Sequence, residues 1–451
     1  MDGFHTRLRS AGMSGAEAAK KAALMEELSA ELRGLRPVAL DQFSAFFVPG
    51  RLEVLGKHTD YAGGRGIICA IEYGLGVVAA PRLDALVRIL DMGRKSDTHF
   101  ALAPDAEPAP GHWSNYAITV ARRIARDFPG ARTGADIVFS SDLPRASGMS
   151  SSSALVIAVF FALAEANSLW QSDSYRECIG SRSGGNESLA GYLAAVESGA
   201  GFASFPGDSG VGTLGGSQDH VAILCSRAGF LRQYSYCPIR LEQEIPVPEK
   251  HVFVLAVSGS KAKKTGNSRD SYNRASLATR KILDVWRRAT GRDDESLAAA
   301  LSSSPDAATR LREIARNSAD SDVSADFLLN RLDHFAAESN EIVPAAAEAL
   351  ARNDMVTAGA LVDRSQLLAE TLLGNQTPET VELARLARTL GADAASAFGA
   401  GFGGSVWALV PSARAEEFRN VWASGYRQLF PARAEASQFL INGAGPGLIQ
   451  F

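Results

Sequence analysis

Apolar residues recur along this chain at two spacings, one typical of helices and one typical of buried strands. Ala, Leu and Met at helical spacing over residues 14–34 predict an amphipathic helix that ends before Pro37. The apolar runs that predict buried strands lie at residues 45–55, with an interruption at Pro49 and Gly50, at 74–81 and at 86–91. The chain is therefore expected to open with a helical arm, followed by an extended core.

Helical and extended segments alternate from residue 112 onward. Helices are expected at 112–128, 152–167, 175–199 and across much of 270–390, and strands at 135–140, 220–226, 252–258 and 405–410. A Gly-, Ser- and Pro-rich stretch precedes residue 220, and irregular stretches of this length are usually functional or disordered. No internal repeat is evident, which argues against a solenoid. We expect a helical arm over residues 1–40, one domain over 41–245 and a second over 246–451.

Composition narrows the class of protein. The chain has 451 residues, of which 46% are hydrophobic and 21% charged, and its formal net charge is −4. This balance is typical of a globular cytoplasmic enzyme and lacks the basic character of a nucleic-acid binder. The four cysteines show neither metal-binding nor disulfide-framework spacing, so we expect reduced thiols. No continuous apolar stretch of about 18 residues occurs, so membrane insertion and secretion are not expected.

A Gly- and Ser-rich loop, PRASGMSSSSA at residues 144–154, joins a predicted strand to a predicted helix. Gly148 allows close approach of the backbone, and the N–H groups at the start of the helix would converge on an anion. The Ser hydroxyls add donors and one candidate metal ligand. The alternative is a helix N-cap within a flexible serine tract. A P-loop nucleotide site is excluded, because the chain has no G-x-x-x-x-G-K-[ST] motif.

The segment GRLEVLGKHTDYAGG, residues 50–64, ends an apolar strand in a cluster of polar side chains. His58, Asp60 and Tyr61 on one turn offer hydrogen-bonding groups in several directions, which suits the adjacent hydroxyls of a sugar. A surface turn after a strand is the alternative, because polar residues are common in turns.

Two further glycine-rich segments carry weaker signals. A glycine pair brings Asp219 and His220 just ahead of the apolar run at 220–226, where a turn or cap residue is the common alternative. The segment GAGFGG, residues 399–404, contains a glycine pattern similar to a dinucleotide fingerprint. It is expected to precede a strand instead of opening a helix, so a Rossmann site is not predicted.

Taken in order, three of these segments resemble the signatures of the GHMP kinase superfamily, and within it those of the galactokinase-like sugar kinases. GRLEVLGKHTDYAGG resembles the N-terminal galactokinase signature, PRASGMSSSSA the phosphate loop, and AFGAGFGGSVWAL the C-terminal motif. Shorter similarities occur at SQDH, residues 217–220, and at SYNR, residues 271–274. The resemblance spans about residues 45–445.

This resemblance implies an α+β fold of two domains, with ATP and a sugar bound in the cleft between them. The N-terminal domain would be of the ribosomal-protein S5 domain 2-like type and the C-terminal domain ferredoxin-like. The implied reaction transfers the γ-phosphoryl group of ATP to the anomeric C1 hydroxyl of a monosaccharide, galactose by default. Asp219 would be the catalytic carboxylate, and Arg51 beside it would lower its pKa and stabilise the transferred charge. Whether Asp219 takes the proton early or acts mainly through its charge stays open.

The other site residues that the resemblance implies fall into three groups. The ATP phosphates would be bound by Gly148, Met149, Ser150, Ser151 and Ser152 and by Gly401, Phe402 and Gly403. Mg²⁺ would be bound by Ser152 and Glu197. The sugar would be bound by Lys57, His58, Asp60 and Tyr272.

Two residues depart from the galactokinase pattern. Lys57 stands where galactokinases carry Glu, and an ammonium can only donate hydrogen bonds. A second hypothesis is therefore another sugar, such as arabinose, a heptose, an N-acetylhexosamine or a uronic acid. His220 stands where galactokinases usually carry Gln, and the spacing between Glu197 and Asp219 is longer than in the family. A third hypothesis is a non-catalytic sugar sensor. Neither nucleic acid nor membrane is an expected partner, and both a monomer and a dimer remain open.

Overall fold

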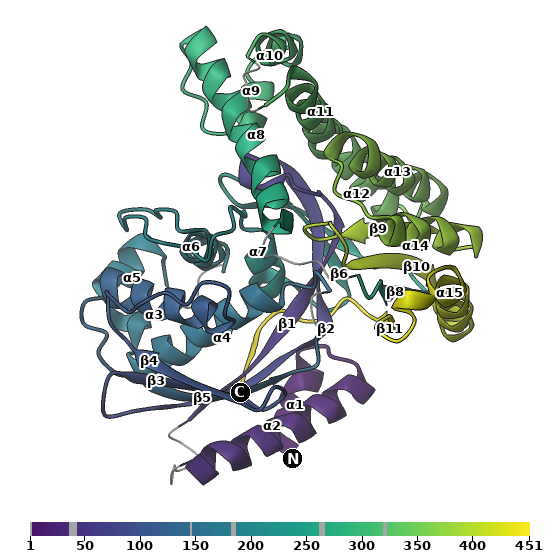
Figure 1. Ribbon diagram of the computed structural model, residues 1–451. Helices are drawn as coiled ribbons and strands as arrows, with labels where there is room; N and C mark the ends of the chain where they lie inside the picture. Colours follow the sequence, from purple (N-terminus) through teal and green to yellow (C-terminus); the bar gives the residue numbers. More distant parts are fainter. Residues whose placement is uncertain (1, 36–42, 145–146, 182–185, 261–266, 319–322) are drawn as a thin grey trace.

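The computed structural model describes residues 2–35, 43–144, 147–181, 186–260, 267–318 and 323–451, and these residues build two β-sheets with helices packed around them (Figure 1). The strands of the first sheet are β1 (Ser44–Leu55), β2 (Arg65–Pro81), β3 (Leu86–Asp91), β4 (Ser96–Ala101), β5 (Ala135–Ser141), β6 (Phe230–Ser235), β7 (Arg240–Pro246) and β12 (Ile449–Gln450). Their order is β12-β1-β2-β5-β3-β4, with β6 added to β2 and β7 to β6. All described pairs are antiparallel except β3 with β5.

Helices cover both faces of the first sheet. The helical arm, α1 (Asp2–Ser10) and α2 (Gly15–Leu35), packs on the face that presents Val78 and Ala80. The opposite face presents Val77 and Ala79 to the helices that follow β4. These helices are α3 (Ser114–Asp127), α4 (Ser151–Ala166), α5 (Asp173–Cys178), α6 (Glu187–Ser198) and α7 (Gln218–Cys225), with a short 3₁₀ turn at Leu169–Gln171. Burial on both faces explains why β1, β2 and β5 contain nearly continuous apolar runs.

The second sheet is smaller. Its order is β11-β8-β10-β9, and it consists of β8 (His251–Val257), β9 (Ala394–Phe398), β10 (Ser405–Pro411) and β11 (Gln438–Asn442). α14 (Pro378–Thr389) and α15 (Ala415–Leu429) share a core with this sheet. α12 (Val343–Ala351) and α13 (Met355–Leu368) lie beside it, and α13 contacts β9. Short 3₁₀ turns at Ser412–Arg414 and Pro431–Arg433 flank α15.

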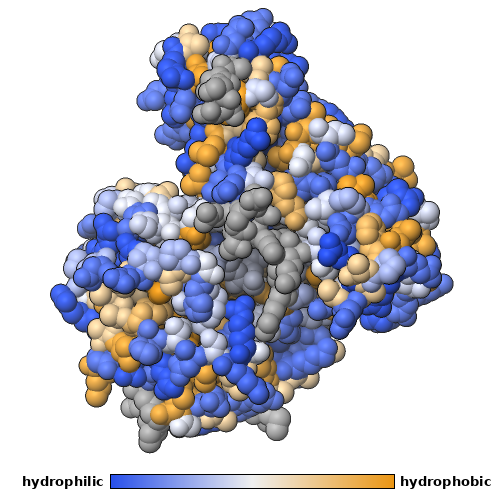
Figure 2. All heavy atoms as spheres, in the orientation of Figure 1, coloured by the Kyte–Doolittle hydropathy of each residue, from blue (hydrophilic) through white to orange (hydrophobic). Residues whose placement is uncertain are grey.

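A helical group projects from the body of the molecule and has a core of its own. It consists of α8 (Asn267–Thr290), α9 (Leu297–Leu301), α10 (Ala307–Arg316) and α11 (Ala325–Ala336). In Figures 1 and 2 this group stands above the two sheets, and its visible surface is mainly hydrophilic. π-helical turns at Ala337–Ile342 and Ala369–Leu373 continue α11 and α13. No helix within the described parts of the chain is long and apolar enough to cross a lipid bilayer.

Most elements expected from the sequence are present, with one error that matters for the site. The run at 220–226 was predicted to be a strand, and this prediction is wrong, because residues 218–225 form α7. Every residue from 220 to 225 is buried, so the run has no polar side from which a helical period could be recognised. β1 continues through Pro49 and Gly50 with a shift in register. The expected domain boundary at 245 falls at the end of β7, and β12 brings the chain end back to β1.

Candidate active site

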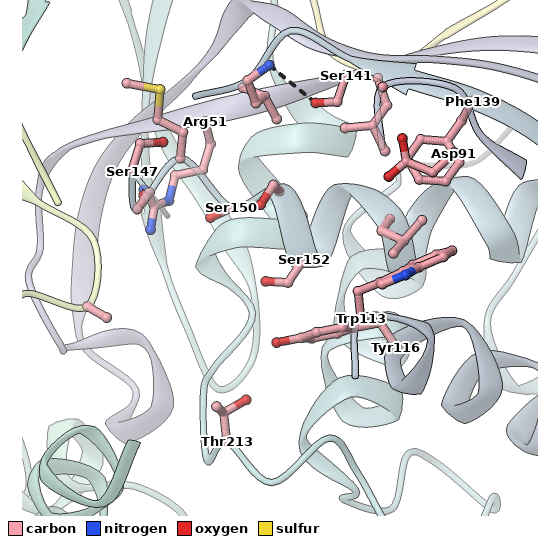
Figure 3. A pocket seen from close by; sticks show the side chains of 18 of the residues that line it. Arg51, Asp91, Trp113, Tyr116, Phe139, Ser141, Ser147, Ser150, Ser152 and Thr213 are labelled. Carbon is pink, nitrogen blue, oxygen red and sulfur yellow. Dashed lines mark hydrogen bonds between the residues drawn. The ribbon is translucent and has the colours of Figure 1, made fainter. Parts of the chain in front are cut away.

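Two adjoining cavities lie where the phosphate loop, β1, α7 and the C-terminal glycine loop meet. The larger has a volume of about 310 Å³ and the smaller one of about 50 Å³. Arg51, Tyr272 and Ala400 line both. The cavities therefore adjoin at the Arg51 side chain, which Figure 3 shows at one end of the larger cavity.

The loop before α4 has the backbone geometry of an anion site. Gly148 has φ +74°, and Ser150, the N-cap of α4, has φ +58°, so both adopt the left-handed conformation. Ser150 is buried and its hydroxyl has no hydrogen-bond partner among the described residues. A serine cap with a free hydroxyl at the positive end of a helix is suited to an anionic ligand. Gly148, Met149, Ser150, Ser151 and Ser152, for which the sequence predicted ATP binding, all line the larger cavity.

The far end of the larger cavity is aromatic, and the sequence motifs did not identify it. Trp113 and Tyr116, at the start of α3, lie across from Phe139 and Asp91 (Figure 3). Asp91 is 4% exposed and accepts a hydrogen bond from the backbone N–H of Arg94 at 3.0 Å. A planar heterocycle fits such a slot, because aromatic rings stack on its faces and a carboxylate accepts from an amino group.

The smaller cavity contains an ion pair between Arg51 and Asp219. Arg51 Nε donates to Asp219 Oδ1 at 2.7 Å, and Arg51 Nη1 donates to the carbonyl of Gly148 at 2.6 Å. Burial lowers the pKa of Arg51, but the neighbouring carboxylates Asp219 and Glu53 outweigh this effect and the net shift is upward. Asp219 lies in the first turn of α7, where the helix dipole favours a negative charge. The guanidinium therefore joins the carboxylate to the phosphate loop.

The signature turn after β1 supplies a second group of polar side chains. His58 Nε2 lies 3.0 Å from the carbonyl of Ala400, and Nδ1 lies 3.0 Å from the hydroxyl of Tyr61. A carbonyl only accepts, so we assign the proton to Nε2, and Nδ1 accepts from Tyr61. Burial and the nearby Arg331 lower the pKa of His58 to about 4, so the ring is neutral at pH 7.

Asp60 and Tyr272 complete the wall of the smaller cavity. Asp60 Oδ2 accepts from the backbone N–H of Gln218 at 3.0 Å, so it holds the start of α7. Burial is the main cause that raises the pKa of Asp60 to about 6. Burial also raises the pKa of Tyr272 well above its usual value, so its hydroxyl keeps its proton. Both side chains offer hydrogen bonds to a hydroxyl-rich ligand.

Lys57 does not reach this cavity, in contrast to the expectation from the sequence. Its side chain is 1% exposed, and Nζ donates to Ser365 Oγ at 3.0 Å. Ser365 Oγ in turn donates to Glu338 Oε1 at 3.0 Å, and Glu338 Oε1 also accepts from the backbone N–H of Gly56. The ammonium thus joins the signature turn to the helices beside the second sheet. Because consecutive side chains of a tight turn point in different directions, the Lys57 side chain contacts Ser365 and the His58 side chain contacts Ala400.

Glu197 lies between two other side chains. Ser153 Oγ donates to Glu197 Oε2 at 2.9 Å, and His220 Nε2 lies 3.2 Å from the same oxygen. Glu197 lines the smaller cavity, whereas Ser152, its expected partner, lines the larger one. The structure therefore shows a direct contact between Ser153 and Glu197.

The C-terminal glycine loop closes both cavities from the side of the second sheet. Gly401 and Phe402 line the larger cavity, whereas Gly403 is not among its lining residues. A Cβ at Gly401 would lie 2.4 Å from the carbonyl of Asn375, so only glycine fits there. The Phe402 N–H donates to that carbonyl at 2.6 Å, which fixes the loop.

Comparison with known proteins identifies the class. Residues 115–195 match the family described as GHMP kinases N terminal domain, and residues 346–428 match GHMP kinases C terminal. Residues 40–81 match the galactokinase galactose-binding signature. The chain therefore belongs to the GHMP kinases, and the two-domain fold expected from the sequence is confirmed.

Within this superfamily the chain is similar to galactokinases. It is 27% identical to the galactokinase of Actinobacillus pleuropneumoniae serotype 5b (strain L20), over 85% of this chain and 89% of the relative. It is 29% identical to the galactokinase of Chloroflexus aggregans, over 84% of this chain and 86% of the relative. The structure of Lactococcus lactis galactokinase complexed with galactose superposes with a TM-score of 0.75 at 21% identity, covering 95% of this chain and 100% of that chain.

Proposed function

We propose that this protein is an ATP-dependent sugar kinase that transfers the γ-phosphoryl group to the anomeric C1 hydroxyl of a monosaccharide, with galactose as the first candidate. One observation carries the proposal: the Arg51–Asp219 ion pair lies where an anion-binding loop and a small polar cavity meet. Nucleotide phosphates at the loop would face a sugar hydroxyl beside Asp219. The four cysteines are free, which supports a location in the cytoplasm.

Phosphoryl transfer requires mainly positioning and charge neutralisation, and the site offers both. The backbone N–H groups at the start of α4 and the Ser150 hydroxyl would bind phosphate oxygens. Asp219 would accept the proton of the attacking hydroxyl, and Arg51 would stabilise charge on the transferred group. The base would stack on Trp113, with its amino group directed to Asp91.

Magnesium fits the donor set that the chain provides. Mg²⁺ prefers oxygen ligands, commonly one or two carboxylates or hydroxyls together with nucleotide phosphates. Ser152 and Glu197 would hold the ion from opposite sides of the boundary between the cavities. The bound ion would neutralise phosphate charge during transfer. Ser153 and His220 would orient the Glu197 carboxylate.

The charges of the smaller cavity favour a neutral sugar over a uronic acid. Its wall contains four carboxylates, Glu53, Asp60, Glu197 and Asp219, against the single guanidinium of Arg51. That guanidinium already pairs with Asp219, and the Lys57 ammonium points elsewhere. Among the described residues that line this cavity, a sugar carboxylate would therefore meet like charges and no unpaired cation, which disfavours its binding. Galactose, arabinose and N-acetylgalactosamine carry no such charge.

The test is ADP release from Mg-ATP across a panel of free sugars that contains galactose, arabinose, N-acetylgalactosamine and galacturonate. We expect turnover on a neutral sugar and none on galacturonate, with Asp219→Asn as the inactive control. The intact Arg51–Asp219 pair argues against a non-catalytic sugar sensor. ATP and sugar binding without turnover on any sugar would favour the sensor instead.

A further inference from the structure

Glu53 is a buried carboxylate of the smaller cavity that lies within the signature segment of residues 50–64 but has no assigned role there. It lies two residues after Arg51 on β1, so both side chains project from the same face of the strand. The residue is 4% exposed. Burial raises the pKa of Glu53 to about 7, although Arg51 and Lys57 act in the opposite direction. Placing a carboxyl group in such surroundings is costly, which indicates a function for it.

The two oxygens of Glu53 accept hydrogen bonds from two different parts of the site. Gln218 Nε2 donates to Glu53 Oε2 at 2.5 Å. The backbone N–H of Gly399 approaches Glu53 Oε1 at 3.4 Å. Gln218 is the first residue of α7 and directly precedes Asp219, whereas Gly399 opens the C-terminal glycine loop. One side chain from β1 thus contacts both the segment with the catalytic carboxylate and the loop that closes the site.

Gln218 is held on three sides. Its amide nitrogen donates to Glu53, and its backbone N–H donates to Asp60. Its amide oxygen packs against Gly66 of β2, where a Cβ would lie 2.6 Å from that oxygen. With Gln218 fixed in this way, the next residue places its carboxylate 2.7 Å from Arg51 Nε.

We propose that Glu53 is a positioning residue, which holds the first turn of α7 and the C-terminal glycine loop so that Asp219 faces the sugar hydroxyl. This inference rests on the proposed kinase function. Rates of enzymatic transfer depend steeply on such alignment, and a displacement of about 1 Å can cost about 100-fold in rate. Glu53 acts through Gln218 and Gly399, so its loss should lower kcat more than it weakens nucleotide binding.

The test compares Glu53→Gln, Gln218→Leu and the double variant, with kcat and the KM for ATP measured at saturating sugar. Glutamine keeps the size of Glu53 but removes its charge and one of its two acceptor oxygens. Glu72→Gln is the matched control, because Glu72 is also a buried carboxylate, accepts hydrogen bonds from Ser14 and lines neither cavity. If Gln218→Leu does not fold, Gln218→Met replaces it.

We expect each single variant to lose about tenfold or more in kcat with the KM for ATP changed less than about twofold, and the double variant to lose no more than the worse single one. A smaller loss in Glu53→Gln, or losses that multiply in the double variant, would overturn the positioning role. Wild-type protein that phosphorylates no sugar would refute the proposed function separately. The crystal structure of Glu53→Gln then decides: Asp219 still hydrogen-bonded to Arg51 beside an unmoved glycine loop would contradict positioning, and a displaced Asp219 would support it.

Discussion

Replacing Lys57 with methionine removes a buried ammonium and leaves an apolar chain of similar length. Lys57 Nζ and Glu338 Oε1 each lie 3.0 Å from Ser365 Oγ, so the two charges are separated by at most about 6 Å. At an effective dielectric constant of about 20, a pair of unit charges at this distance attracts by about 3 kcal/mol. Glu338 is fully buried, so it would keep its desolvation cost without this cation. We therefore expect Lys57→Met to lower the free energy of unfolding by about 3 kcal/mol.

The assay is urea unfolding followed by intrinsic fluorescence, with Lys20→Met as the matched control. Lys20 also pairs with a glutamate, Glu17, but its side chain is 67% exposed, and exposed pairs contribute about 0–1 kcal/mol. Because Lys57 lines neither cavity, the ranking of sugars by kcat/KM should be the same in Lys57→Met and the wild type. The reasoning is refuted if Lys57→Met is as stable as the Lys20→Met control, or if it changes the preference between galactose and galacturonate.

Four further predictions concern the site itself. Asp219→Asn keeps the shape of the side chain but removes its charge, so kcat should fall by about 10²–10⁴-fold with nearly unchanged ATP binding by calorimetry; unaltered turnover would refute the catalytic assignment. Gly148→Val should weaken ATP binding, because φ +74° is strained for a β-branched residue; retained affinity would mean that the loop does not bind phosphate. Trp113→Ala should raise the KM for ATP while kcat changes little, which initial rates at varied ATP would show. Asp60→Asn tests the pH dependence of stability. Burial raises the pKa of Asp60 from 3.8 to about 6, so the folded state keeps a proton that the unfolded state loses. The Asp60 carboxyl therefore lowers the free energy of unfolding as the pH rises from about 4 to 6. The free energy of unfolding of Asp60→Asn should therefore rise relative to that of the wild type by up to about 3 kcal/mol between pH 4 and 6, and no further above pH 6. Urea titrations at pH 4–7 would show this rise. A difference that shrinks with rising pH would contradict the raised pKa.

Most of the elements that the sequence predicted correctly depend on residues that are close together in the chain. The loop that leads into a helix after residue 150 is one of these, because its glycine, its serines and the following helix are contiguous in the chain, and the left-handed Gly148 and Ser150 explain that composition. The arm over residues 14–34 was recognised from helical spacing alone, and it forms α2. A few neighbouring residues determine the conformation of such segments, so it can be predicted without knowledge of tertiary contacts.

The aromatic end of the larger cavity could not be predicted in this way. Asp91 ends β3, Trp113 and Tyr116 begin α3, and Phe139 lies on β5. Each is an ordinary residue in its own segment, and only the order of strands in the first sheet brings them together. The error at residues 220–226 has a related cause, because burial on all sides removed the polar face that distinguishes a helix from a strand.

The charge of the smaller cavity shows that a departure from a family motif can be interpreted only when the direction of the side chain is known as well as its identity. The presence of Lys57 at a position where galactokinases carry Glu first suggested a different sugar, a uronic acid among the candidates, on the assumption that the ammonium faces the ligand. Its contact with Ser365 removes that assumption, while Glu53, four residues earlier on β1, places a carboxylate at the cavity instead. The same stretch of sequence therefore supports opposite conclusions about the substrate, depending on which of the two residues faces the cavity. The geometry favours a neutral sugar, because the Lys57 ammonium contacts the helices beside the second sheet, whereas the Glu53 carboxylate lies near Asp219.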